Sequence, residues 1–232
     1  MNKIAIAIDR AYAAGRRSLS RGRIFMKPQR SFLSLVCLLF LVLWCATVVA
    51  GAQQTIVAIR HAEKPASSLG QLTCKGLNRA LALPKVLIPR YGKPDRIYAP
   101  DPGTRIGQLG NLSYSYVRPL MTIEPTAIQL EMPVNALIGF KNVGQLRKEL
   151  LAPENANSVI YLAWEHNYLN EFAKRMLKAY GKEPSAVPDW PDNEYDRIYV
   201  FRIKEVDGRR ELTFSVEYQG LNDSLSDKCP GQ

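Results

Sequence analysis

The sequence predicts an α/β fold: a three-layer sandwich with a mostly parallel central sheet flanked by helices, and an antiparallel hairpin at one edge. Two apolar runs of β-forming residues, 55–59 and 158–164, are typical of buried parallel strands. Amphipathic segments with helical spacing alternate with strand-like segments, as in α/β proteins. Near the end of the chain, Asp207-Gly208 separates two strand-like segments, which indicates a hairpin.

The other elements are expected between these strands. Thr73 is a candidate cap for a helix over 75–89, which Pro84 is expected to bend or break. In order, we expect a strand at 96–99, an irregular loop at 103–115, a helix from about 118 to 130, a short strand at 132–134, a helix at 143–151, a helix at 169–177 that stops at Gly181, and hairpin strands at 197–204 and 211–218.

Charge divides the chain into an N-terminal segment and a domain. The net charge of the 232 residues is +10, but eight of the basic residues and only one acidic residue fall in residues 1–52. Residues 53–232 therefore have a net charge of only +3, which argues against nucleic-acid binding. We expect one domain over residues 53–232, long enough for a single α/β core.

The N-terminal segment has the pattern of a secretory signal peptide. Residues 31–50 carry no charge, basic residues precede them, and Ala50-Gly51-Ala52 matches an A-x-A cleavage site. Met26 begins a better-proportioned signal, so residues 1–25 are interpreted as an extension. We expect a periplasmic or secreted protein. The alternative is an uncleaved membrane anchor, because residues 31–50 are long enough to span a bilayer.

Residues 53–232 contain two cysteines, Cys74 and Cys229. An even pair in an oxidising compartment predicts a disulfide. It would tie the first helix to the C-terminal tail, and the chain-entropy model gives such a loop about 5 kcal/mol of stabilisation.

The chain has two histidines, and both follow the strongest predicted strands. Arg60 and His61 come directly after the first strand, and His166 follows the second. A lone histidine at a strand end is often satisfied by backbone groups. Ligands bind outside the carboxyl ends of parallel strands, however, so two such histidines indicate a site. A histidine there is a candidate nucleophile, base or ligand, and the arginine favours an anionic substrate.

These residues resemble the motifs of the histidine phosphatase (phosphoglycerate mutase-like) superfamily. Arg60-His61-Ala62 resembles its first motif, and the strand that ends near His166 resembles its third. The second motif of the superfamily is an arginine followed by x-x-x-Thr, and Arg118 with Thr122 fits it. Arg105 is a competing match for this arginine. The segment Leu72 to Ala80 (LTCKGLNRA) and the Cys-Pro tail are similar to a secreted bacterial subgroup.

The resemblance implies a phosphomonoester hydrolase. His61 would attack phosphorus and carry the phosphoryl group as phosphohistidine. Arg60 and Arg118, or Arg105 in place of the latter, would bind the phosphoryl oxygens, and His166 would donate a further hydrogen bond. No metal or cofactor is expected. The expected partner is a phosphorylated small molecule or an envelope glycolipid, with the membrane involved only if the N-terminal segment stays uncleaved.

The proton donor for the leaving group is not apparent in the sequence. Residues 136–145, where the resemblance places a carboxylate, contain no Asp or Glu. Glu131 is the candidate by order along the chain, and Glu63 and Glu165 are adjacent to the histidines. Each is as readily an ordinary surface carboxylate. The alternative function is therefore a weakened or inactive phosphate-binding or interaction module of the same fold, because protonation typically contributes ~10²–10⁴-fold to rate.

Aromatic residues near these motifs are weaker candidates for substrate contact. Trp164 and Trp190 are expected in the core more readily than in a pocket. Tyr114 and Tyr116 flank the expected irregular loop.

Overall fold

The computed structural model describes residues 53–67, 69–109 and 112–232. The predicted signal peptide and its extension, residues 1–52, lie outside the described residues. Within the described part, no helix is both long enough and apolar enough to cross a membrane.

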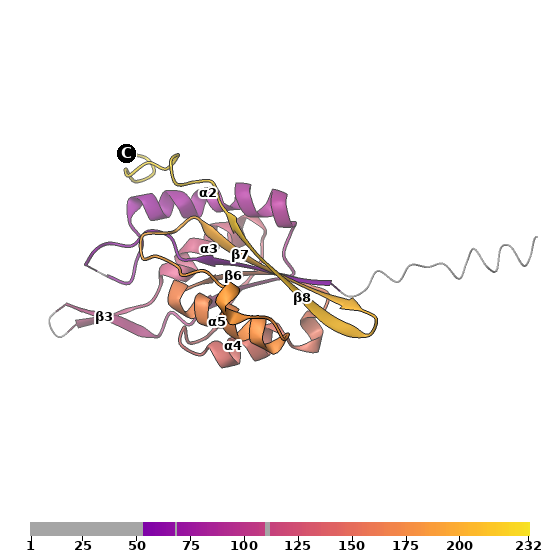
Figure 1. Ribbon diagram of the computed structural model, residues 1–232. Helices are drawn as coiled ribbons and strands as arrows, with labels where there is room; N and C mark the ends of the chain where they lie inside the picture. The colour runs from indigo at the N-terminus through magenta and orange to yellow at the C-terminus, as the bar shows by residue number, and fades with distance from the viewer. Residues whose placement is uncertain (1–52, 68, 110–111) are drawn as a thin grey trace, which may run out of the picture. The chain divides into compact units, whose positions relative to one another are not determined.

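Six strands of the described part form one mixed sheet in the order β5-β2-β6-β1-β7-β8 (Figure 1). Strands β5, β2, β6 and β1 run parallel, whereas β7 is antiparallel to β1 and to β8. The predicted α/β class and its edge hairpin are confirmed. The strands are β1 (Gln53–Arg60), β2 (Arg96–Pro100), β5 (Val134–Ile138), β6 (Val159–Trp164), β7 (Arg197–Val206) and β8 (Arg209–Tyr218).

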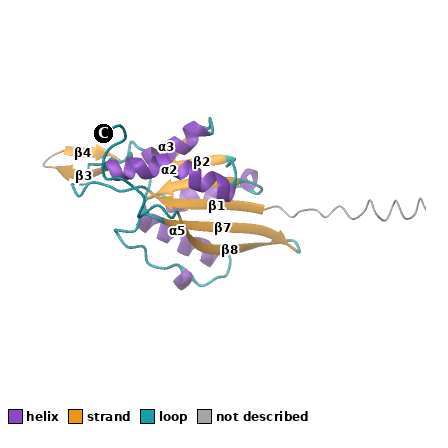
Figure 2. Cartoon of the chain, turned by 90° about the horizontal axis from the view of Figure 1, so that it is seen from above, coloured by secondary structure: helices purple, strands orange, loops and turns teal. Residues whose placement is uncertain are grey.

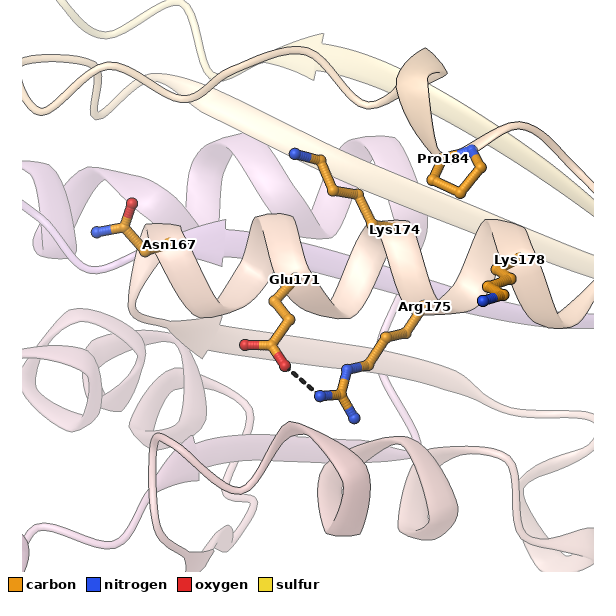
Figure 3. Close-up of a pocket in the computed structure, with 6 residues that line it drawn as sticks. All are labelled: Asn167, Glu171, Lys174, Arg175, Lys178 and Pro184. Carbon is orange, nitrogen blue, oxygen red and sulfur yellow. Dashed lines mark ion pairs between the residues drawn. The ribbon is translucent and has the colours of Figure 1, made fainter.

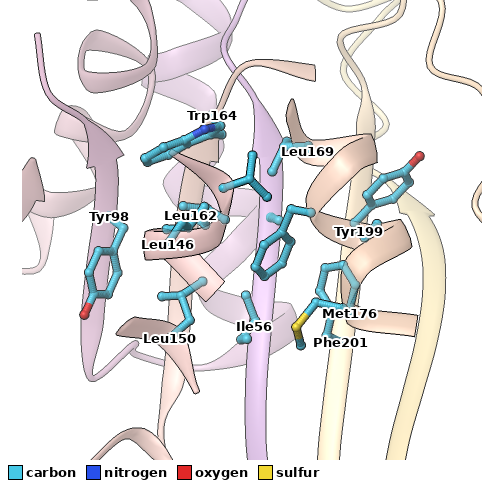
Figure 4. Packing of buried hydrophobic residues seen from close by; sticks show 14 of the residues in the cluster. Ile56, Tyr98, Leu146, Leu150, Leu162, Trp164, Leu169, Met176, Tyr199 and Phe201 are labelled. Carbon is cyan, nitrogen blue, oxygen red and sulfur yellow. The ribbon is translucent and has the colours of Figure 1, made fainter. Parts of the chain in front are cut away.

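In the described part of the chain, α-helices cover both faces of this sheet (Figures 1 and 2). Side chains of β1 alternate between the faces: Ile56 packs with one pair of helices and Val57 with the other. The cluster that holds Ile56 also contains Trp164 and Leu162 (Figure 4). The helices are α2 (Cys74–Tyr91) and α3 (Arg118–Gln129) on the Val57 face, and α4 (Val143–Leu150) and α5 (His166–Ala179) on the Ile56 face.

Strand register places both histidines at one edge of the sheet. β1 and β6 are neighbours and parallel, with Arg60 opposite Trp164. The backbone N–H of His61 continues this ladder by donating to the carbonyl of Trp164 at 2.9 Å. The two strands therefore end together, and the polar residues that follow them lie on the same side.

Helix α2 differs from the expected helix because neither proline interrupts it. Pro84 and Pro89 lie inside the helix, which continues to Tyr91. A proline removes one helical hydrogen bond and usually kinks the helix. Here Leu83 and Leu87, on either side of Pro84, are both buried against the sheet, and this packing holds the helix together.

The segment expected as an irregular loop forms a second, two-stranded sheet instead. β3 (Arg105–Leu109) pairs with β4 (Leu112–Ser115), and the hairpin projects beyond the carboxyl ends of the parallel strands (Figures 1 and 2). The expected strand at 132–134 also lies later, because β5 begins at Val134.

The predicted disulfide is present in the structure. Cys74, the first residue of α2, is bonded to Cys229, with their Cα atoms 4.5 Å apart. Asn78, one turn further along α2, donates from its amide to the carbonyls of Ser226 and Lys228, both at 2.8 Å. The C-terminal tail is thus attached to α2 both covalently and through hydrogen bonds.

Candidate functional site

The imidazole of His61 is buried directly after β1. Only 1% of the residue is exposed. Its Nδ1 lies 2.8 Å from the carbonyl oxygen of Ala62, and because a carbonyl can only accept, Nδ1 carries the hydrogen. Burial, and next the positive charge of Arg118, hold the pKa of His61 well below the usual range of imidazole. The ring is therefore neutral near pH 7, with a lone pair on Nε2.

Arg60 is fully buried beside this ring and only partly paired. Its Nη1 donates to the carbonyls of Pro191 at 3.1 Å and Glu194 at 2.9 Å. Its Nε and Nη2 are buried and have no hydrogen-bond partner among the described residues. The guanidinium lies 4.1 Å from the centroid of the Tyr195 ring. Two donors of this fork are thus buried and available to an anion.

Arg118, the first residue of α3, presents a second fork of the same kind. It is 5% exposed, and its Nε and Nη1 are buried with no partner in the described part of the chain. Its guanidinium lies 4.8 Å from the centroid of the Tyr116 ring. Its charge acts on His61, which places it at the same site.

A hydroxyl in α3 joins the two motifs. Thr122 accepts a hydrogen bond from the backbone N–H of Ala62 at 2.9 Å and donates to the carbonyl of Arg118 at 2.8 Å. The spacing Arg-x-x-x-Thr therefore has a physical basis: one helical turn separates the arginine from the residue that fixes the loop after His61.

His166 begins α5 between two carboxylates. Glu165 caps the helix by accepting from the backbone N–H of Tyr168 at 3.0 Å, and its Oε1 lies 2.7 Å from Nδ1 of His166. The other ring nitrogen, Nε2, lies 2.8 Å from Oδ1 of Asp192. Burial alone would raise the pKa of Glu165, but contact with His166 and the N–H of Tyr168 outweigh burial and lower it. Glu165 is therefore ionised at neutral pH.

Together these groups gather buried hydrogen-bond donors around a neutral imidazole. Buried donors without partners are rare in folded proteins, and a group of them at one place is typical of a site that binds an acceptor such as an ion, a water molecule or a substrate. Here four such N–H-bearing atoms belong to two guanidinium forks, whose planar geometry suits tetrahedral oxyanions. The hydroxyl of Tyr116 is also buried without a partner among the described residues. The neutral ring of His61 adds the lone pair of an uncharged nitrogen.

Three of the residues considered from sequence take no part in this arrangement. Glu131 follows the C-terminal end of α3 and precedes β5, so it lies at the opposite edge of the sheet from Arg118, and its assignment as the acid is wrong. Glu63 accepts from Nε and Nη2 of the buried Arg79 and is committed to that ion pair. Arg105 is exposed on β3 and donates to Ser115 at 3.3 Å. Of the two candidate arginines, Arg118 is the buried one, and its charge lowers the pKa of His61.

Sequence reasoning missed a segment that covers the site. Residues 190–195, which we call the strap, carry Asp192, Tyr195 and the two carbonyls that Arg60 binds. Trp190 holds it from within by donating from its indole N–H to the carbonyl of Glu194 at 2.9 Å. No periodicity or spacing marks this segment, because its contacts depend on the fold. Trp164 is a core residue, as expected.

A surface hollow of about 360 Å³ lies along the outer side of α5 and is separate from the residues above (Figure 3). Its lining includes Lys174, Arg175 and Lys178, and Arg175 pairs there with Glu171. None of the predicted site residues lines it.

Comparison with solved structures identifies the fold. The chain superposes on mycobacterial glucosyl-3-phosphoglycerate phosphatase with a TM-score of 0.50 and 12% identity, over 71% of this chain and 98% of that one. It also matches a mutant phosphoserine phosphatase from Entamoeba histolytica, in complex with phosphoserine, with a TM-score of 0.45 and 16% identity, over 74% and 99% of the two chains. No protein-family profile matches the sequence, and no curated protein does. The chain has the histidine phosphatase fold.

Proposed function

We propose that this chain, which has the histidine phosphatase fold, hydrolyses phosphomonoesters through a phosphohistidine on His61. The observation that carries the proposal is that a neutral, buried imidazole is accompanied by two guanidinium groups, each with two buried nitrogen atoms that have no hydrogen-bond partner among the described residues. A phosphoryl group has oxygens for these donors and a phosphorus atom for the Nε2 lone pair.

The chemistry follows from the protonation states. The Nε2 lone pair of His61 forms a bond to phosphorus while the bond from phosphorus to the ester oxygen breaks. The electron pair leaves with that oxygen, which takes up a proton. Water then attacks the phosphohistidine, the N–P bond breaks, and inorganic phosphate leaves. Arg60 and Arg118 offset the charge on the phosphoryl oxygens throughout, and their burial strengthens this interaction.

The proposed substrate is a phosphorylated small molecule or an envelope glycolipid met outside the cytoplasm. The signal-peptide pattern of residues 1–52 and the Cys74–Cys229 disulfide support an exported protein, periplasmic or secreted. The names of the two solved phosphatases above refer to phosphorylated small molecules, which supports the same substrate class.

The test compares the native protein with His61→Ala on p-nitrophenyl phosphate and on an alkyl phosphate. We expect the native protein to hydrolyse the aryl ester and to form an acid-labile phosphoenzyme, and His61→Ala to do neither. Unchanged hydrolysis in His61→Ala would refute the proposal. Tight binding of vanadate by the native protein with no hydrolysis of either ester would instead support the phosphate-binding module.

A further inference from the structure

Building on the proposed function, we propose that His166, with the carboxylate of Glu165 against its Nδ1, protonates the leaving oxygen. The general acid that was not apparent in the sequence is then a histidine, His166, with a carboxylate next to its ring. Glu165 acts through His166 and is a positioning residue.

Carboxylate oxygens lie close to both ring nitrogens of His166. Oxygens of Glu165 and Asp192 lie 2.7 and 2.8 Å from Nδ1 and Nε2, and an ionised carboxylate only accepts. The Nδ1 contact has the distance of an ion pair without the alignment of a hydrogen bond, so Glu165 acts on the ring mainly through its charge. That charge is largely shielded from water, because the Glu165 side chain is 15% exposed, whereas the side chain of Asp192 is 90% exposed.

The two carboxylates therefore have different parts. Glu165 is fixed as the cap of α5 and stays ionised, so it cannot itself deliver a proton. Asp192 is almost fully solvated, and its Oδ1 marks where an oxygen that accepts from Nε2 lies. A substrate oxygen that replaced it would receive a hydrogen bond from the same nitrogen. His166 also contributes to lowering the pKa of His61, which places the two histidines at one site.

The remaining nearby carboxylates are committed elsewhere. Glu63 is bound by Arg79. Asp101, which follows β2, accepts from the backbone N–H of Gly103 at 2.8 Å within its own loop. Glu194 accepts from the backbone N–H of Asp196 at 2.7 Å.

His166 gives up a proton when the phosphohistidine forms and regains one when the phosphohistidine is hydrolysed. As the P–O bond breaks, the Nε2–H bond of His166 breaks too, its electron pair stays on nitrogen, and the proton goes to the ester oxygen. In the second half, water attacks phosphorus and gives a proton to Nε2, which restores the imidazolium.

Leaving-group dependence tests the proposal because only a poor leaving group needs the proton. Glu165→Gln keeps the oxygen that caps α5 and removes the charge. We expect it to lower kcat on glycerol phosphate about tenfold or more beyond its effect on p-nitrophenyl phosphate, part of the ~10²–10⁴-fold typical of proton transfer. The alkaline limb of its pH profile on glycerol phosphate should move to lower pH. Asp189→Asn removes an exposed charge next to the strap and is the matched control. It should leave kcat unchanged on both substrates.

If Glu165→Gln lowers kcat equally on both substrates, the proposal is overturned and the role of Glu165 is structural. A selective loss in Asp192→Asn but not in Glu165→Gln would overturn it in favour of Asp192. A phosphoenzyme formed by Glu165→Gln from the aryl ester shows that the proposed function stands whichever acid is found.

A spectroscopic measurement keeps the test independent of variant activity. The chain has only two histidines, so His61→Asn leaves His166 as the single imidazole in a nitrogen-15 NMR spectrum. We expect two protonated ring nitrogens at pH 7 in this protein, and one in the double variant that adds Glu165→Gln. A singly protonated His166 in the protein with Glu165 intact would overturn the proposal.

Discussion

At the scale of single residues, the burial of His61 links its protonation to folding. The folded protein holds this ring neutral, with a pKa well below that of an exposed histidine. In the unfolded chain the ring takes up a proton near its ordinary pKa of about 6.5. Between these two pKa values the unfolded state binds more protons, so acid favours unfolding there.

We therefore expect native stability to fall as pH drops below about 6.5, and His61→Asn to remove part of that dependence. One bound proton corresponds to about 1.4 kcal/mol per pH unit, so lowering the pH from 7.5 to 5.5 should cost the native protein about 1.4 kcal/mol more than it costs the variant. Urea unfolding of both proteins at the two pH values measures this. Parallel losses in the two proteins would mean that His61 is not held neutral.

The choice between the two candidate arginines is also tested at this scale. Arg118→Ala removes two buried donors, and charged hydrogen bonds are worth about 1.5–3 kcal/mol each, so kcat/KM on p-nitrophenyl phosphate should fall about 10²-fold or more. Arg105→Ala, a substitution of the exposed arginine, should change kcat/KM less than about twofold. The reverse order would move the second fork to β3.

The positions of the residues that follow strand ends or belong to the arginine motif could be predicted from the sequence. Arg60, His61, Arg118 and His166 are all buried at the carboxyl edge of the sheet. Asp192 and Tyr195 were not named, because they reach the site only when the segment before β7 crosses it. Glu131 was placed wrongly, because order along the chain does not show which end of α3 faces the site.

At the scale of elements, α3 holds the loop after His61 through the hydroxyl of Thr122. This side chain is fully buried and satisfies the backbone N–H of Ala62. One turn later, Thr126 is equally buried, but its hydroxyl has no partner among the described residues. The two threonines form a natural pair for comparison.

Thr122→Val should destabilise the protein by about 1–3 kcal/mol, because it leaves the Ala62 N–H buried without an acceptor. It should also lower kcat/KM, because the loop after His61 loses its tie to Arg118. Thr126→Val makes the same change of shape, but its hydroxyl has no partner to lose among the described residues. It should leave the stability of the protein unchanged or raise it slightly. Thermal unfolding and p-nitrophenyl phosphate kinetics measure both effects, and equal behaviour of the two variants would contradict the role of Thr122.

Most elements could be predicted because their apolar spacing matches their burial. The exceptions have physical reasons. The β3–β4 hairpin is held by backbone pairing, such as Ile106 with Tyr114, and backbone pairing leaves little pattern in the sequence. Helix α2 continues through Pro84 because tertiary packing outweighs the local penalty, which sequence spacing does not reveal.

At the scale of the whole molecule, two further connections join the hydrogen bonds of Asn78 in tying the C-terminal tail to the first helix. One is the Cys74–Cys229 disulfide. The other is Arg79, which is 1% exposed and binds Glu63, Asp196, Gln219 and Asn222. Through these partners the arginine joins the loop after His61 to the residue that follows the strap and to the C-terminal tail. The site and the C-terminus therefore share one buried charge network.

Replacing both cysteines by alanine should lower the free energy of unfolding by about 2–5 kcal/mol while the protein still folds, because the Arg79 network remains. Urea unfolding of the double variant measures the loss, and the native protein treated with a thiol reductant should show the same value. Equal stability of oxidised and reduced native protein would contradict a structural role for the bridge.

The strap is attached to the site through its main chain, and this bears on how the protein can be diversified. Arg60 and Trp190 hold it by the carbonyls of Pro191 and Glu194, and a carbonyl is present whatever the side chain. The side chains between these anchors, Asp192 and Asn193, are exposed, and Asp192 reaches His166. A library randomised at these two positions should therefore keep its fold, and substrate range can be selected there without changing Arg60 or Arg118.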